Sequence, residues 1–132
     1  MDVTLNTSLH QYSGDMNVTY FNNSPDKLDK VFWYAFFNAF QPGSMMDVRS
    51  RNISDPDSRV GDRILHLPEE EWGWIKDVEL TMNGEPCTVT IEETIIVAEL
   101  PASILPGGHA DFKMSWNAQV PRQIRRSGWM NK

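Results

Sequence analysis

The stretch Asp111-Phe-Lys-Met-Ser-Trp-Asn-Ala-Gln-Val120 decides the fold class of this chain. Every second side chain in it is apolar, from Phe112 to Val120, and polar side chains lie between them. A period of two residues is typical of a β-strand that buries one face and exposes the other. The stretch therefore predicts a long strand in an antiparallel sheet.

The chain that precedes this strand shows similar short apolar segments, separated by turn signals. Asn83-Gly84 is the strongest short signal for a β-hairpin, and Glu92-Glu93 indicates a second tight turn. Strands are accordingly predicted at residues 74–82, 86–91 and 94–100. A corner rich in Gly and Pro is expected at residues 101–108.

The N-terminal part of the chain predicts three more strands. Alternating apolar residues indicate two of them near residues 3–5 and 16–20, with turns expected at residues 12–15 and 22–26. Residues 28–40 are the most apolar and aromatic segment of the chain. We expect a central strand there, with its aromatic side chains in the core, because Val, Phe, Trp and Tyr favour strands.

At least seven short strands with little helix predict an all-β fold, an antiparallel β-sandwich. The 132 residues suit a single domain, 1–132, with one sizeable core. Residues 41–72 carry repeated turn signals and no clear period, so a long irregular loop is expected there. At most one short helix is predicted, and Pro68 followed by acidic residues is the expected start.

Composition excludes several classes of function. Eighteen acidic and 12 basic residues give a formal net charge of −6, which argues against a general nucleic-acid surface. No apolar run approaches the ~20 residues that span a bilayer, so no membrane insertion is expected. Cys87 is the only cysteine and is interpreted as a small strand residue.

The sequence offers no catalytic or metal-binding motif. His10, His66 and His109 are scattered, and neither a His-Glu-x-x-His helix motif nor a Gly-x-Ser-x-Gly turn is present. The carboxylates lie mostly in adjacent pairs and turns, where a shared acid–base cleft is not expected. We therefore assign no catalytic residue, no metal ligand and no cofactor to this chain.

Arginines supply the only candidate surface for a partner. Four lie in the long loop, where pairing with Asp47, Asp55, Asp57 and Asp62 is the alternative to a docking role. Three more lie near the C-terminal end. The candidate interdomain or partner residues are Arg49, Arg51, Arg59, Arg63, Arg122, Arg125 and Arg126.

Several segments together resemble the N-terminal domain of M1-family zinc metallopeptidases, the aminopeptidase N-like enzymes. The first is Gln11-Tyr-Ser-Gly-Asp-Met-Asn-Val-Thr-Tyr-Phe-Asn-Asn-Ser-Pro-Asp-Lys-Leu28, followed by Phe36-Phe-Asn-Ala-Phe40. Residues 41–51, 55–63 and 120–128 resemble the branch found in Bacteroidetes-type bacteria. The likeness covers nearly the whole chain, and the order and spacing of these segments give it its specificity.

The resemblance implies a non-catalytic β-sandwich that packs on a catalytic domain and helps wall the substrate cleft. Family members remove N-terminal residues from peptides with a zinc ion. Their catalytic domain supplies a His-Glu-x-x-His helix and a Gly-x-Met-Glu-Asn strand, and neither motif occurs here. The chain itself is thus expected to be inactive, and the zinc is expected in the rest of the parent enzyme.

The family domain is longer than this chain, so the resemblance also implies a truncated sandwich with an exposed sheet edge after Trp116–Val120. Self-association through that edge is one expectation. The alternative function is an autonomous binding sandwich for carbohydrate or a protein partner, with Trp72, Trp74 and Trp129 as candidate stacking surfaces. The compartment stays open: this branch is often exported to the periplasm or cell envelope, and the chain carries no signal peptide.

Overall fold

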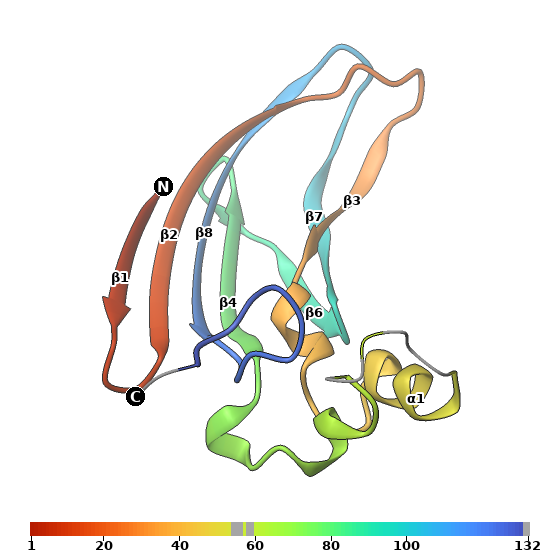
Figure 1. The fold of residues 1–132 in the computed structure, drawn as a ribbon. Coiled ribbons are helices and arrows are strands. Elements are labelled where there is room, and N and C mark those ends of the chain that lie inside the picture. The colour runs from red at the N-terminus through yellow and green to blue at the C-terminus, as the bar shows by residue number, and fades with distance from the viewer. Residues whose placement is uncertain (54–56, 58–59, 131–132) are drawn as a thin grey trace.

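Two antiparallel sheets lie face to face in the computed structural model, which describes residues 1–53, 57 and 60–130 (Figure 1). The prediction of an all-β antiparallel sandwich is confirmed. The five-stranded sheet has the order β1 (Asp2–Asn6), β2 (Gln11–Phe21), β8 (His109–Gln119), β4 (Trp74–Met82) and β5 (Glu85–Pro86). The three-stranded sheet has the order β3 (Leu28–Tyr34), β7 (Ile95–Ile104) and β6 (Thr88–Glu92).

Strand β8 is the centre of the larger sheet. It pairs with β2 over its whole length, from Gln11↔Gln119 to Phe21↔His109, and with β4 on its other side. The prediction that the C-terminal strand has a free edge is therefore wrong, because β8 is hydrogen-bonded on both sides. The edges of this sheet are β1 and β5.

The main core fills the space between the sheets. Of the alternating residues predicted to face inward, Phe112, Met114 and Ala118 are buried and Trp116 is partly buried. Phe112 contacts Trp33 of β3 edge to face with ring centroids 5.4 Å apart. The buried members of this cluster are Leu80, Met82, Ala98, Ile104, Ala110, Phe112 and Met114. Cys87 packs against the same cluster, but it lies between β5 and β6 rather than within a strand.

The aromatic segment 28–40 is not one central strand. Strand β3 ends at Tyr34, lies at a sheet edge, and is followed by the 3₁₀ turn η1 (Phe36–Ala39). Its partner β7 begins only at Ile95, and the amide of Ala35 already bonds to the hairpin residue Thr94. Beyond that point no neighbouring backbone continues the pairing, so the chain turns.

The turn expected at residues 12–15 is also wrong. Those residues lie inside β2, and the β1–β2 hairpin turns before it, where His10 has φ 53°. Gly14 serves a different purpose, because the Trp116 ring lies over it: an added Cβ would stand 2.2 Å from Trp116 Cζ2. The glycine is thus a sign of close approach rather than of a turn.

The corner expected at residues 101–108 begins later, because β7 extends to Ile104, and the turn expected at Glu92-Glu93 lies at 93–94. Two turn predictions are confirmed. Asn83 and Gly84 have φ values of 53° and 89° between β4 and β5, which fits the expected tight hairpin. The turn at residues 22–26 depends on Asn22, which is fully buried and donates from its amide to the carbonyls of Asp26 and Ile104 at 2.8 and 2.9 Å. It carries the chain from one sheet to the other at the end opposite α1 (Figure 1).

The long segment 41–72 is more ordered than the expected irregular loop. It contains the helix α1 (Met45–Asn52) and the 3₁₀ turns η2 (Arg63–His66) and η3 (Glu69–Glu71). The helix predicted to start at Pro68 is only η3, whereas the one α-helix of the described chain lies earlier, at Met45. This segment surrounds a second core cluster made of Ala39, Phe40, Val60, Ile64, Leu67 and Ile124.

The C-terminal segment after β8 packs onto this second core. Ile124 is 1% exposed, and the backbone amide of Arg122 donates to the carbonyl of Glu71 at 2.9 Å. Two further bonds join Gln123 N to Trp129 O and Trp129 N to Pro121 O, each at 3.0 Å. This segment therefore closes the end of the sandwich beside the second core.

Replacing Gly14 with Ala should destabilise the fold by about 1–3 kcal/mol, because the new methyl group displaces the Trp116 ring. Ser13→Ala, on the opposite face of the same strand, is the control and should change stability by no more than about 0.5 kcal/mol. Urea unfolding followed by circular dichroism measures both. Equal stability of the two variants would contradict the packing described here.

Ile124→Ala should cost about 2–5 kcal/mol, since it leaves a cavity in the second core. Met130→Ala is the control. Met130 lies six residues further along the same segment and is 62% exposed, so its substitution should change the free energy of unfolding little. Thermal unfolding of both variants gives the comparison. An Ile124 variant as stable as the parent would mean that the C-terminal segment does not contribute to the domain.

Candidate docking surface

The outer side of the three-stranded sheet carries large exposed aromatic side chains. In β3, Val31 and Trp33 point inward, since they pair with the buried residues Ala98 and Ile96 of β7. The alternation of the strand therefore turns Phe32 and Tyr34 outward. Their residues are 63% and 65% exposed, and Phe36, just after the strand, is 65% exposed.

These side chains form one continuous surface. Phe32 pairs with Val97 and Tyr34 with Ile95 across the two strands, and the Phe36 ring stacks on Tyr34 with centroids 4.8 Å apart and an interplanar angle of 7°. We call Phe32, Tyr34, Phe36, Ile95 and Val97 the outer aromatic face.

A charged pair lies at one end of the outer aromatic face. Lys30 pairs with Glu99 across β3 and β7, and its ammonium donates to the carboxylate at 2.8 Å. This bond raises the pKa of Lys30. Both side chains are more than half exposed, so the pair contributes little to stability and acts as a polar border.

A hollow of about 720 Å³ adjoins the other end. Ile95 belongs to both the outer aromatic face and this hollow, so the two are contiguous. Its apolar wall includes Met45 and Met46 of α1, while Arg49 and Glu93 supply charges. We call it the methionine hollow; its lining is Ala39, Met45, Met46, Arg49, Glu92, Glu93, Thr94, Ile95 and Arg125.

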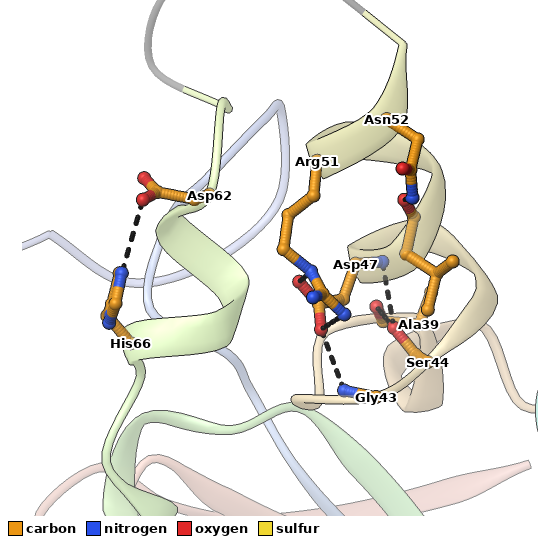
Figure 2. Close-up of polar contacts among 9 residues, drawn as sticks. Ala39, Gly43, Ser44, Asp47, Arg51, Asn52, Asp62 and His66 are labelled. Carbon is orange, nitrogen blue, oxygen red and sulfur yellow. Dashed lines mark hydrogen bonds and ion pairs between the residues drawn. The ribbon is translucent and has the colours of Figure 1, made fainter.

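Helix α1 is held in place by its first turn. Ser44 caps it, accepting from the amide of Asp47 at 3.2 Å and donating to the carbonyl of Ala39 at 2.7 Å. Asp47 is completely buried and accepts from the amide of Gly43 at 2.8 Å. Both of its oxygens also accept from the guanidinium of Arg51 at 3.1 Å, as Figure 2 shows.

One of the ion pairs predicted in the long loop is present in the structure. Arg51 and Asp47 form a two-bond pair within α1, in which the carboxylate is 1% exposed and the guanidinium side chain 35%. His66 and Asp62 form a second contact at 3.2 Å, but both side chains are largely exposed (Figure 2). The Asp47 pair lies within α1, so it stabilises the helix whose Met45 and Met46 form the methionine side of the hollow.

The candidate arginines lie at different places in the structure. Arg49 and Arg125 line the methionine hollow, whereas Arg51 forms the ion pair with Asp47. Arg122 lies 4.5 Å above the Trp129 ring, which also stacks on His10 at 4.0 Å. Arg63 belongs to η2 and Arg126 to an exposed bend, while Arg59 and its possible partner Asp55 lie outside the described residues.

The aromatic residues of the docking surface were missed by sequence reasoning, which predicted all aromatics of segment 28–40 to be core. The run Val31-Phe-Trp-Tyr34 is apolar at every position, so it has no period that separates inward from outward side chains. Only the pairing of β3 with β7 assigns the faces. Arg49 and Arg125 of the candidate arginines line the hollow, whereas Arg51, Arg63, Arg122 and Arg126 of the described chain do not.

The described residues hold no group of three or more His, Cys, Asp or Glu side chains that could bind a metal ion. Burial raises the pKa of the Cys87 thiol, which disfavours its nucleophilic thiolate form. Along the described chain no helix is both long and apolar enough to cross a membrane. Comparisons with protein-family models, curated proteins and solved structures found no match to this chain.

Asp47→Ala should destabilise the chain by about 1–3 kcal/mol, because the Gly43 amide and the Arg51 guanidinium lose their shared acceptor. Asp62→Ala is a matched control: it also removes an aspartate paired four residues away, but at an exposed site, and should cost less than about 0.5 kcal/mol. Chemical denaturation measures both. A control that costs as much as Asp47→Ala would contradict the anchoring role of the buried carboxylate.

Proposed function

We propose that this chain is the non-catalytic N-terminal β-sandwich domain of an M1-type zinc aminopeptidase. In this role it packs on the catalytic domain and helps wall the substrate cleft. The reaction of the parent enzyme is the hydrolytic removal of N-terminal residues from peptides. The family comes from the sequence resemblance, and an all-β sandwich is the fold that the resemblance implies.

The outer aromatic face is the observation that carries the docking role. Isolated exposed apolar side chains are normal on soluble proteins, but a contiguous group of them marks an interaction surface. Phe32, Tyr34 and Phe36 are each about two-thirds exposed and lie side by side. Aromatic residues are also the ones that contribute most to the energy of protein interfaces.

The segments that carry the resemblance build this same surface. Residues 36–40 form η1 and provide Phe36 and Ala39, and residues 41–51 provide α1 with Met45, Met46 and Arg49. Asn38, within the first of them, donates to the carbonyl of Glu93 at 2.8 Å and accepts from the amide of Ile75 at 2.6 Å. The family-like motif thus ties the two sheets together beside the proposed interface.

The role proposed for this chain is mechanical rather than chemical. In the family that the chain resembles, the zinc belongs to the catalytic domain, and we propose the same for the parent enzyme. The arginines at the methionine hollow suit acidic groups on the partner, and Glu92 and Glu93 suit basic ones. A mixed rim around an apolar centre is the composition of an interface between domains.

The purified chain should show no zinc-dependent hydrolysis of aminoacyl p-nitroanilides, because the motifs for zinc binding and amine recognition are absent from its sequence. The coding sequence that follows the Lys132 codon should continue in frame to Gly-x-Met-Glu-Asn and His-Glu-x-x-His. Zinc-dependent turnover by the chain alone, or a stop codon directly after Lys132, would overturn the proposal.

Tyr34→Thr should be nearly neutral in the isolated chain, within about 1 kcal/mol, because the side chain is exposed on an edge strand. In the intact enzyme the same change should cost about 2 kcal/mol, the loss expected when an aromatic anchor leaves an interface. Leu105→Thr, a 63% exposed residue at the opposite end of the sandwich, is the control. Urea unfolding of the isolated chain and of the intact enzyme measures the effect of each substitution. A Tyr34→Thr effect of equal size in the isolated chain and in the intact enzyme would contradict docking through this face.

A further inference from the structure

A second hollow lies on the other side of the molecule, on the outer face of the five-stranded sheet. Its volume is about 410 Å³, and it crosses β1, β2, β8 and β4 at the end of the sheet near the C-terminal segment (Figure 1). Hydroxyl and amide side chains dominate its lining together with one indole. The lining residues are Thr4, Asn6, Gln11, Tyr12, Ser13, Trp74, Lys76, Asp77, Asn117 and Ala118.

Trp74 provides the aromatic surface of this hollow. It is the first residue of β4 and pairs with Gln119, whereas the next residue, Ile75, pairs with the buried Ala118. The alternation therefore places Trp74 on the outer face, away from both cores. Of the three tryptophans considered as stacking surfaces, Trp129 is stacked against His10, and Trp72 packs on the second core.

One face of the Trp74 ring already attracts positive charge. The ammonium of Lys76 lies 4.1 Å from the ring centroid. An exposed contact of this kind is worth only about 0.5–1 kcal/mol, so another group can displace it at small cost. The C–H groups on the face of a pyranose ring carry partial positive charge and suit the same electron-rich surface.

Asp77 stands beside the ring in an unusual backbone conformation. Its φ is 53°, and it lies in the irregularity of the β4–β8 pairing between Lys76 and Glu79. Such bulges redirect a side chain, and non-glycine residues with positive φ are concentrated at ligand sites. The carboxylate of Asp77 accepts from the amide of Asn117 at 3.1 Å. The two side chains together present acceptors and a donor, which is what a pair of sugar hydroxyls requires.

The charge of the hollow favours a neutral ligand. Lys76 and Asp77 supply the charges of its lining, and these charges balance. The phenol of Tyr12 lies on the inner side of β2, since Tyr12 pairs with the buried Ala118 and its ring contacts Phe37. A phosphate or nucleic-acid ligand would require a cluster of cations.

We propose that this hollow binds a pyranose ring of a neutral glycan. The sugar ring stacks on Trp74 in place of the Lys76 ammonium, and adjacent hydroxyls bond to Asp77 and Asn117. This inference does not depend on the aminopeptidase assignment, since the site lies on the sheet opposite the outer aromatic face. A chain docked through that face would keep the glycan site open.

The test is a titration of the ¹⁵N-labelled chain with maltohexaose, cellohexaose, xylohexaose and mannohexaose, followed by NMR. At least one of them should shift the indole N–H of Trp74 and the backbone amides of Asp77 and Asn117 in a saturable way. Trp74→Ala should weaken that binding by roughly tenfold or more, the loss of one aromatic stacking contact. Asp77→Gly, which removes the carboxylate but accepts the positive φ, should weaken it as well.

Phe21→Ala is the control, because it removes an exposed aromatic side chain from the same sheet at its far end. It should bind the glycan as the parent does, and all variants should keep the dispersed amide spectrum of the folded chain. Absence of saturable shifts with all four glycans would overturn the proposal. Binding that survives both Trp74→Ala and Asp77→Gly in a folded chain would overturn it as well.

Discussion

Strand β8 is hydrogen-bonded on both of its sides, and this double pairing assembles the larger sheet. Its partner β2 precedes residues 28–72 in the sequence, and its partner β4 follows them. This one strand therefore brings the N-terminal hairpin and the central hairpin into a single sheet. The pairing also fixes which face of each strand is buried, since a slip of one residue would reverse every side chain. Close contact of Trp116 with Gly14 is possible only in this register.

The two sheets differ in what they expose. The outer face of the larger sheet is covered with polar side chains, with Trp74 beside one polar hollow. The smaller sheet has aromatic and β-branched residues on both faces, because β3 carries apolar residues at consecutive positions. A strand of that composition is normal when both of its faces are covered. In this chain one face is open, and it is on this open face that we propose the partner domain docks.

The second core connects the irregular parts of the sequence to that face. Val60, Ile64 and Ile124 come from two distant segments and are all nearly inaccessible to solvent. Their packing holds the described parts of segment 41–72 against the sandwich, and the buried Asp47 stabilises the first turn of α1. The amide of Met45 in that turn donates to the carboxylate of Glu93 at 3.3 Å, beside the 93–94 turn. The methionine hollow is thus a product of a hydrophobic contact and a buried charge pair, neither of which lies in the strands of the sandwich.

Local features of the sequence predict the fold class, the strands with clear alternation and the hairpin turn at Asn83-Gly84, because the two-residue period and turn chemistry are local properties. The hairpin expected at Glu92-Glu93 turns one residue later, at 93–94, because Glu92 still pairs with Ile95. The sequence also placed Arg49 and Arg125 among the candidate surface residues. Pairing between distant segments places β8 at the centre of its sheet, ends β3 at Tyr34 and sets Gly14 under an indole ring rather than in a turn. It alone separated Phe32 and Tyr34 from Val31 and Trp33, because a continuous apolar run has two equivalent faces until a second sheet covers one of them.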